Sequence, residues 1–190
     1  MMSVDFAAAR ATMVDTQVRP QDVTDLTIQD AMRAVPREAL IPASKVSMAY
    51  ADTEVEYAPG RWLLSPRDVA KLLQGLKPKP GEAALAIAAP YAAAVLEAMG
   101  LQVTRLNGAD LGSPSGQWPL IVCEGAVTRA PESWLAAIAP GGRMGVIERN
   151  GPAGRAMIHV RLEAGVGSRA LFDAAPPVMA GFEVEPGFVF

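Results

Sequence analysis

The sequence predicts an α/β fold built on a largely parallel sheet, and three observations lead to this prediction. Short apolar runs alternate with helical patterns between residues 83 and 148, as in a parallel sheet with crossover helices. The last strand-like segments follow one another closely, which predicts an antiparallel end to the sheet. Hydrophobic residues make up 51% of the 190-residue chain, enough for a single buried core.

The N-terminal part of the chain predicts helices. Ser3 is a suitable N-cap for a helix that runs to about Gln17, and residues 19–22 (RPQD) break it. Thr24 then caps a second helix, which ends at Pro36. The apolar stripe of this second helix recurs at i, i+3, i+4 and i+7 and consists of Ile28, Ala31, Met32 and Val35.

The next segment is irregular up to residue 60, with a short strand predicted at residues 55–57. Ser65 and Pro66 then open a third helix, because serine is a good N-cap and proline suits the first helical position. The run KPKPG at 77–81 ends this helix. Its predicted buried face consists of Val69, Leu72, Leu73 and Leu76.

The sheet region and the tail complete the pattern. In chain order we predict strand 83–88, helix 91–99, strand 101–106, loop 107–119, strand 120–123, helix 131–138, turn 140–142, strand 143–148 and strand 156–162. The tail, residues 182–190, alternates enough to predict one more strand. We expect one domain over residues 1–190, with a helical N-terminal subdomain at 1–60 and an α/β core at 61–190.

Charge and cysteine content exclude several classes of function. A net charge of −3 argues against nucleic-acid binding, which needs a basic surface. One cysteine and one histidine cannot build a disulfide framework or a zinc site. The least charged region, residues 83–123, is interrupted by prolines and glycines, so we expect no membrane span. The start of the chain does not resemble a signal peptide, and we expect a cytoplasmic protein.

Four stretches of the chain resemble the protein-L-isoaspartate O-methyltransferase family, especially its alphaproteobacterial members. They are MVDTQVRP at 13–20 with DVTD at 22–25, the pair AM at 31–32 and VPRE at 35–38 with AYAD at 49–52, the segment 119–143 with EGA at 124–126 and PGGR at 140–143, and the tail with LFDA at 171–174 and FVF at 188–190. The resemblance implies a Rossmann-like methyltransferase fold that binds S-adenosylmethionine and esterifies isoaspartyl carboxylates. It covers the chain from about residue 13 onward.

The resemblance also implies a cofactor site that this sequence departs from. The family has an acid and a glycine-rich turn after the first strand of the sheet, and an acid after the second. Here the turn is shorter and contains neither, and its residues are Ala86, Ala88, Ala89, Pro90 and Tyr91. Alanine is strained at positive φ, its Cβ occupies space that a ligand uses, and proline lacks an amide donor.

The second strand of the predicted sheet shows the same departure. Asn107 stands where the resemblance implies an acid that binds the ribose of the cofactor. The loop that follows is too short for a βαβ crossover, so we expect that one strand–helix unit is missing and that the sheet is shortened.

Two further positions bear on catalysis and cofactor binding. The active-site serine that the resemblance implies falls on Leu64, while Ser65 stands one residue later. Ser65 is therefore a candidate catalytic residue, although the role of helix N-cap explains it as well. Glu124 directly follows a buried strand, at the carboxyl end where α/β sites gather, so it is a candidate for cofactor binding. The alternative for Glu124 is an ionised carboxylate at the rim with no catalytic task.

Three other residues have simpler interpretations. His159 lies within a predicted strand, and we interpret it as a hydrogen-bonded or surface histidine because no catalytic partners are identifiable. Cys123 ends a buried strand, where a small apolar thiol is the ordinary role. Arg105 raises the hypothesis that its side chain fills part of an emptied cofactor pocket. We expect no metal site.

Two hypotheses about function follow. The first is a relative that has lost S-adenosylmethionine binding and catalysis, needs no cofactor, and acts through another protein or through a second copy of itself. The second is an active protein-L-isoaspartate O-methyltransferase with a divergent pocket, for which S-adenosylmethionine is the cofactor. Neither hypothesis involves nucleic acid or a membrane.

Overall fold

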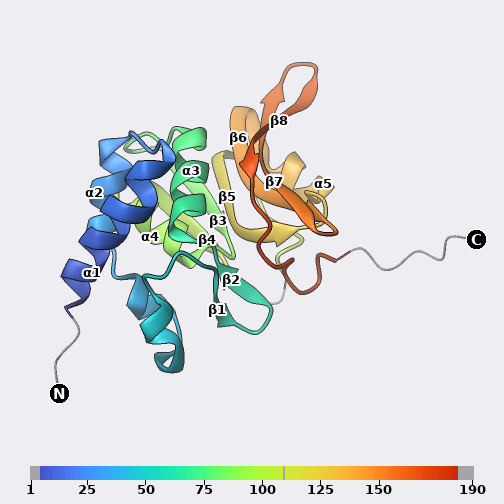
Figure 1. Ribbon diagram of the computed structural model, residues 1–190. Coiled ribbons are helices and arrows are strands. Elements are labelled where there is room, and N and C mark those ends of the chain that lie inside the picture. Colours follow the sequence, from blue (N-terminus) through green and yellow to red (C-terminus); the bar gives the residue numbers. More distant parts are fainter. Residues whose placement is uncertain (1–4, 109, 184–190) are drawn as a thin grey trace, which may run out of the picture.

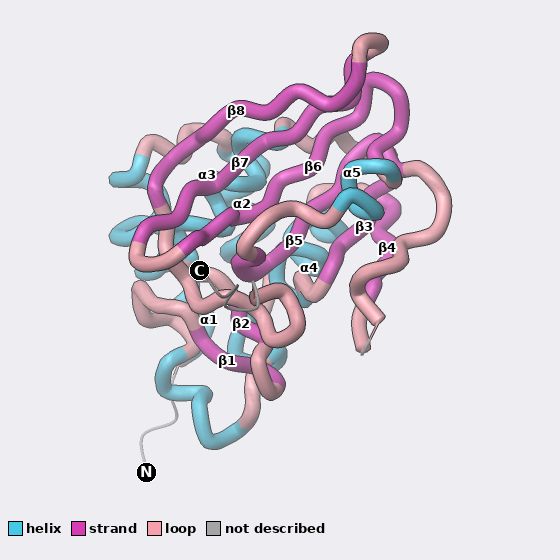
Figure 2. The backbone as a smooth tube through the Cα atoms, turned by 90° about the vertical axis from the view of Figure 1, so that its right-hand side faces the viewer, coloured by secondary structure: helices cyan, strands magenta, loops and turns pink. Residues whose placement is uncertain are grey.

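Figure 1 shows the computed structural model, which describes residues 5–108 and 110–183. Its centre is a six-stranded sheet in the order β4-β3-β5-β6-β7-β8, whose strands run side by side in Figure 2. The strands are β3 (Ala83–Ile87), β4 (Gln102–Leu106), β5 (Trp118–Val127), β6 (Ile138–Asn150), β7 (Ala153–Leu162) and β8 (Gly165–Asp173). The pairs from β4 to β6 are parallel and the last two are antiparallel. The predicted α/β fold with an antiparallel end is thereby confirmed.

The connection between β4 and β5 is short. β3 leads to β4 through the helix α4 (Pro90–Ala98), an ordinary crossover. The described residues between β4 and β5 form no helix. β4 is therefore the last strand on its side, and among the described residues its outer edge has no partner strand. This agrees with the expected loss of one strand–helix unit.

Two apolar layers cover the two faces of the sheet, because successive side chains of a strand point in opposite directions. Ala84 and Ala86 of β3 belong to the core shared with four helices, whereas Leu85 and Ile87 belong to a second core with α5 (Glu132–Ala136). The four helices lie on one side of the sheet and α5 on the other (Figure 1). The four helices on one side are α4 together with α1 (Phe6–Met13), α2 (Leu26–Ala34) and α3 (Pro66–Leu76).

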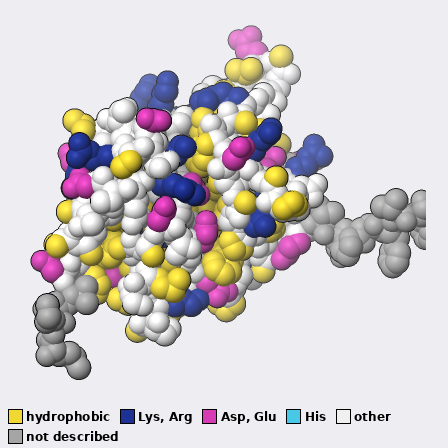
Figure 3. Space-filling model, in the orientation of Figure 1, with side chains coloured by type: hydrophobic (Ala, Val, Ile, Leu, Met, Phe, Trp, Pro, Cys, Tyr) yellow, Lys and Arg dark blue, Asp and Glu magenta, His cyan; other side chains and the backbone are white. Residues whose placement is uncertain are grey.

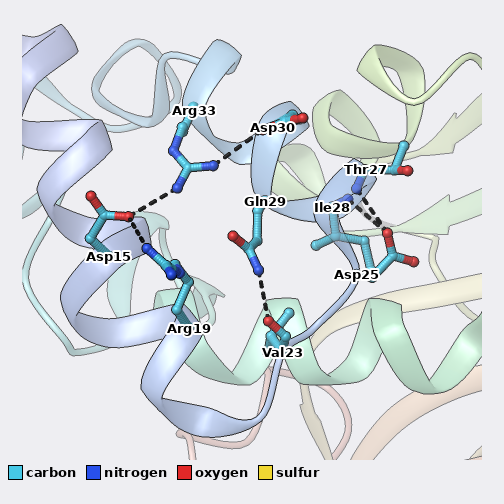
Figure 4. A network of polar contacts seen from close by, with 9 residues as sticks. All are labelled: Asp15, Arg19, Val23, Asp25, Thr27, Ile28, Gln29, Asp30 and Arg33. Atoms are coloured by element: carbon cyan, nitrogen blue, oxygen red, sulfur yellow. Dashed lines mark hydrogen bonds and ion pairs between the residues drawn. The ribbon is translucent and has the colours of Figure 1, made fainter.

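Polar contacts hold the N-terminal helices together (Figure 4). Asp15, in the π-helical turn that extends α1, accepts a hydrogen bond of 2.9 Å from Arg33 of α2. Arg33 also pairs with Asp30 at 3.2 Å. These exposed pairs contribute little stability. The buried Gln29 side chain donates to the Val23 carbonyl at 2.9 Å, so it fixes the connection between the two helices.

The first two helices start at other residues than predicted. Asp5 caps α1 and Asp25 caps α2, because their carboxylates accept hydrogen bonds from first-turn amides. Thr24 does not cap α2; its backbone N–H donates instead to the Gln74 side chain at 2.8 Å. Ser3 lies outside the described residues. α2 does end before the predicted proline, and its apolar stripe is buried as expected.

The sheet contains a strand that the sequence did not predict. β8 includes two glycines and mostly exposed side chains, so it lacks an apolar alternation; its hydrogen bonds to β7 make it a strand. The strand predicted in the tail is absent at Phe182 and Glu183, and residues 184–190 lie outside the described residues. A short two-stranded sheet, β1 (Val55–Ala58) with β2 (Arg61–Leu63), confirms the first small strand and adds its partner.

The turn predicted at residues 140–142 is wrong, because β6 already begins at Ile138 and includes it. Correspondingly, α5 ends at Ala136, before the predicted Ile138. Close packing explains the glycine at position 142. A Cβ there would lie 2.8–2.9 Å from three backbone carbonyl oxygens, those of residues 139, 119 and 118. Only glycine fits this close approach without a backbone shift.

The third helix follows its prediction closely. α3 begins at Pro66 and buries its predicted apolar face against the sheet. Its exposed side meets β8 at Gly75, where a Cβ would run into the side chain of Leu171. This close approach brings the end of α3 against β8.

Candidate functional site

The candidate site lies at the carboxyl ends of β3, β4 and β5. In α/β sheets, ligands bind outside these ends, at the point where the strand order reverses. β3 is that point here, since its successors β4 and β5 lie on either side of it. A hollow of about 380 Å³ opens at this end, and its lining includes Tyr57, Arg61, Ala88, Pro90 and Asn107.

The β3–α4 turn, which the resemblance assigns to the cofactor, is short. Ala88 has φ +45°, a left-handed conformation that is strained for alanine. Its N–H donates to the Leu106 carbonyl at 2.9 Å, and its carbonyl accepts from the Tyr57 hydroxyl at 3.2 Å. Of the other residues predicted for this turn, Ala86, Ala89 and Tyr91 are buried, and Pro90 lines the hollow.

We expect Ala88→Gly to leave the free energy of unfolding almost unchanged, and Ala86→Gly to lower it by about 1–2 kcal/mol. Both substitutions remove a buried methyl group and make the unfolded chain more flexible. Only the first also relieves a left-handed alanine, which offsets about 1–2 kcal/mol. Urea unfolding of the two variants measures the difference. Equal losses would show that Ala88 carries no strain.

Glu124 of β5 is fully buried and accepts hydrogen bonds from three backbone amides. One carboxylate oxygen accepts from Tyr91 and Ala92, in the first turn of α4, at 3.0 and 3.1 Å. The other accepts from Leu64 at 3.3 Å. The carboxylate thus caps α4, which Ala89 at the N-cap position cannot do. The interpretation of Glu124 as a rim carboxylate is wrong, because β5 continues beyond it and keeps the side chain inside.

Arg37 is the cationic neighbour of this carboxylate, and the sequence reasoning did not identify it. The guanidinium is buried; its Nε donates to the Ala49 carbonyl at 2.8 Å and one Nη to the Leu64 carbonyl at 2.6 Å. Its central carbon lies 4.8 Å from the ring centroid of Tyr91. The only sequence signal was the family-like segment at 35–38, since no periodicity marks this arginine as buried.

The pKa values of this buried pair shift in opposite directions. Burial raises the pKa of Glu124 to about 7, although the positive charge of Arg37 and the three amide donors favour the carboxylate. Burial lowers the pKa of Arg37, and the charge of Glu124 opposes that change. The two groups therefore depend on each other for their charged forms.

Leu64 and Ser65 lie beside this pair. Leu64 is buried, and its backbone bonds to both charged side chains, so the position that the resemblance assigns to a serine serves as a structural link. Ser65 is also buried, and its Oγ accepts a hydrogen bond of 3.3 Å from the Asp68 amide. It is the N-cap of α3.

Ser65→Ala is expected to lower the free energy of unfolding by about 1 kcal/mol, because the first turn of α3 loses a cap in a buried setting. Urea denaturation followed by circular dichroism measures the loss. Ser44→Ala is the matched control, because Ser44 is not the N-cap residue of a helix. It is expected to have little effect. A loss for Ser65→Ala no larger than the control would contradict the capping role.

The remaining polar candidates are scattered. Asn107 is exposed at the end of β4 and lines the hollow. Arg105 does not line it; its guanidinium pairs with Glu97 at 2.8 and 3.0 Å. Arg61 lines the hollow in its place and donates to the Ala180 carbonyl at 2.8 Å. The hypothesis that Arg105 fills the pocket is therefore not supported by its position.

Cys123 and His159 lie in surroundings that suit a structural role. Cys123 is buried, and burial raises the pKa of its thiol, which disfavours the reactive thiolate. His159 is nearly buried, and its Nε2 lies 2.9 Å from a carboxylate oxygen of Glu148. This hydrogen bond lowers the pKa of Glu148. Neither residue reaches the lining of the hollow.

Two features are absent from residues 5–108 and 110–183. Among them, no three His, Cys, Asp or Glu side chains cluster closely enough to hold a metal ion. None of the helices in this part of the chain has both the length and the apolar character needed to cross a membrane.

Known protein sequences and solved structures resemble this chain, whereas no family model matches it. A protein-L-isoaspartate O-methyltransferase of Methylorubrum extorquens (strain PA1) is 33% identical over 184 residues, which covers 82% of this chain and 80% of the relative. Its counterpart in Methylorubrum populi is 32% identical over 181 residues and covers 80% and 85%. A relative of the same name in Koribacter versatilis is 28% identical over 197 residues, covering 88% of each chain.

The structural comparison extends the likeness to the fold. A Plasmodium falciparum chain assigned to the protein-L-isoaspartate O-methyltransferases, crystallised with S-adenosyl-L-homocysteine, superposes with a TM-score of 0.72 at 14% identity. The match covers 90% of this chain and 97% of that one. A second structure of this name has a TM-score of 0.63 at 16% identity, covering 86% and 63%.

Proposed function

The chain belongs to the protein-L-isoaspartate O-methyltransferase family, and from this premise we propose that it is a non-catalytic member with a role in protein interaction or regulation. In this proposal the chain binds no S-adenosylmethionine and transfers no methyl group. The chain keeps the fold of the family and has lost the cofactor site at the carboxyl end of the sheet.

The observation that carries the proposal is the position of Glu124. The amino end of the helix after the first sheet strand is a natural place for an anionic ligand, because its free amides and its dipole favour negative charge. Here the amides of Tyr91 and Ala92 already bond to the Glu124 carboxylate. A negatively charged ligand group at the same place would lose these donors and would face a carboxylate.

Two neighbouring features support the proposal. The turn before α4 has alanine at a left-handed position and proline at the first helical position, so it offers neither space nor an amide at Pro90. Asn107 stands where an acid for the ribose hydroxyls is implied, and the strand–helix unit that would follow is missing. These residues do not fit S-adenosylmethionine.

The alternative is an active protein-L-isoaspartate O-methyltransferase with a divergent pocket. One observation favours it: a hollow of about 380 Å³ does open at the carboxyl ends of β3 and β4. The relatives in Methylorubrum carry the name of this activity. In that case a cofactor would have to bind without the amides of α4.

Thermal unfolding with ligand separates the two proposals. A ligand present at a hundred times its dissociation constant adds about 2.7 kcal/mol to the stability of a folded protein. We expect no rise in melting temperature with S-adenosylmethionine or S-adenosyl-L-homocysteine, and no methyl transfer to an isoaspartyl peptide. The Methylorubrum extorquens relative is the control under the same conditions. A rise comparable to that of the control would overturn the proposed loss of binding.

The partner in this proposal is another protein or a second copy of the chain, and the compartment is the cytoplasm, where a lone cysteine stays reduced. Neither nucleic acid nor a membrane takes part. Sedimentation of the purified chain distinguishes the partners: a dimer favours the second copy, and a monomer favours another protein.

A further inference from the structure

A groove lined by positive charge lies on the opposite side of the molecule from the candidate site. Two adjoining hollows of about 340 Å³ each share the residues Gly75, Lys77 and Arg169. Lys79 lines the first hollow and Lys71 the second. We call this the α3–β8 groove. Gly141 and Arg143, in the first half of β6, line the first hollow, whereas the candidate site lies at the carboxyl ends of β3, β4 and β5. Figure 3 shows Lys and Arg side chains over the upper end of α3 and near β8.

Four basic side chains of this groove make no ion pair with the described residues and donate to none of their backbone carbonyls. Of the 17 Lys and Arg side chains of the chain, all of them described, eight pair with carboxylates. Four others donate to backbone carbonyls. Of the five that do neither, four line this one groove: Lys71, Lys77, Lys79 and Arg169. The fifth is Arg129.

Acidic side chains do not cancel this charge. Arg143, which also lines the groove, donates to both carboxylate oxygens of Glu82, so that pair adds no net charge. Lys79 lies close enough to help lower the pKa of Glu82, but its ammonium makes no ion pair. Asp22 is the acid among the described lining residues, at one end of the groove. In a protein of net charge −3, four cations without an ion pair among the described residues make this a local positive field.

The groove also has apolar contacts and an open strand edge. Leu171 and Phe172 are half-buried in its lining. The ammonium of Lys71 lies 4.6 Å from the ring centroid of Phe172, which holds it in place. β8 is the last strand of the sheet, so among the described residues its outer backbone has no partner strand. Such an edge accepts an extended peptide as an added strand.

We propose that the α3–β8 groove binds an acidic, extended segment of a partner protein. Its carboxylates pair with the four cations, and its apolar side chains rest against Leu171 and Phe172. An extended chain suits two shallow, adjoining hollows beside a strand edge better than a compact anion does. The inference rests on the proposed interaction role, to which it adds the chemistry of the partner, but it uses no residue of the candidate site.

The test is fluorescence anisotropy of the intact protein with a labelled peptide in which glutamate and leucine alternate. We expect binding that weakens as salt is added, and none with a peptide that carries lysine in place of glutamate. The variant Lys71→Gln/Lys77→Gln/Arg169→Gln is expected to bind about tenfold more weakly. The matched variant Arg105→Gln/Arg129→Gln/Arg155→Gln loses the same charge elsewhere and is expected to bind like the wild type.

Three outcomes would overturn the inference. They are the absence of glutamate-peptide binding, equal weakening in the two triple variants, and displacement of the peptide by low concentrations of inorganic phosphate, which would indicate a small-anion site. Should the groove variant fail to fold, Arg169→Gln with Arg155→Gln as its match repeats the comparison at two exposed strand positions. The ligand experiment on S-adenosylmethionine is independent, so the two proposals fail separately.

Discussion

Replacing Glu124 by alanine is expected to lower the free energy of unfolding by about 3–5 kcal/mol. The substitution leaves the amides of Tyr91, Ala92 and Leu64 without an acceptor in the interior. It also leaves the guanidinium of Arg37 buried without a compensating charge, which is the more costly effect. Chemical denaturation followed by circular dichroism at neutral pH measures the loss.

Two further variants define what this carboxylate contributes. Glu124→Gln is expected to lose less than Glu124→Ala, because its amide oxygen still accepts from the first turn of α4. Glu97→Ala removes a carboxylate from an exposed pair with Arg105 and is expected to change stability by less than about 1 kcal/mol. If Glu124→Ala lost no more than this control, the carboxylate would not be the cap that the structure shows.

Arg37→Met is expected to lower the free energy of unfolding by a similar amount, about 3–5 kcal/mol, because it strands the buried carboxylate of Glu124. The carbonyls of Ala49 and Leu64 also lose their donors. Chemical denaturation at two pH values measures this loss and its dependence on pH.

The pH dependence has a definite sign. Burial raises the pKa of Glu124 to about 7 in the folded protein, so the folded state holds a proton that the unfolded chain releases at lower pH. Stability therefore falls as the pH rises from that of a free glutamate towards 7. Without Arg37 the pKa of Glu124 rises further, so the fall extends to higher pH.

The deficit of Arg37→Met relative to the wild type is thus expected to be larger at a pH of about 8 than at about 5. Arg105→Met, which removes an exposed arginine, is the control and is expected to show a small deficit at both. A deficit of Arg37→Met that did not change with pH would contradict the coupling between the two buried groups.

Much of the fold could be predicted because its signals are local. The proline and serine that open α3 and the apolar run of β5 identify their elements within a few residues. β8 could not be predicted in this way. Its sequence carries two glycines and exposed side chains, and it becomes a strand only through pairing with β7. Strands whose stability comes from a neighbour leave little trace in their own residues.

The candidate site could be predicted only in part. The alanine turn, Asn107 and the short loop after it could be found by comparing each residue with the family pattern. The burial of Glu124 and its three amide donors could not, because those donors come from segments 32 to 60 residues away in the chain. The burial of Arg37 could not be predicted either, because the carbonyls that it contacts lie 12 and 27 residues away in the chain.

The sequence by itself determined the family resemblance, the parallel sheet with its antiparallel end, and the alanines of the turn before α4, since all of these depend on neighbouring residues. Only the tertiary structure decided that Glu124 closes the amino end of α4 and that the cations of α3 and β8 meet at one groove. Both depend on which distant segments come together, and burial and electrostatic interaction act through space, not along the chain.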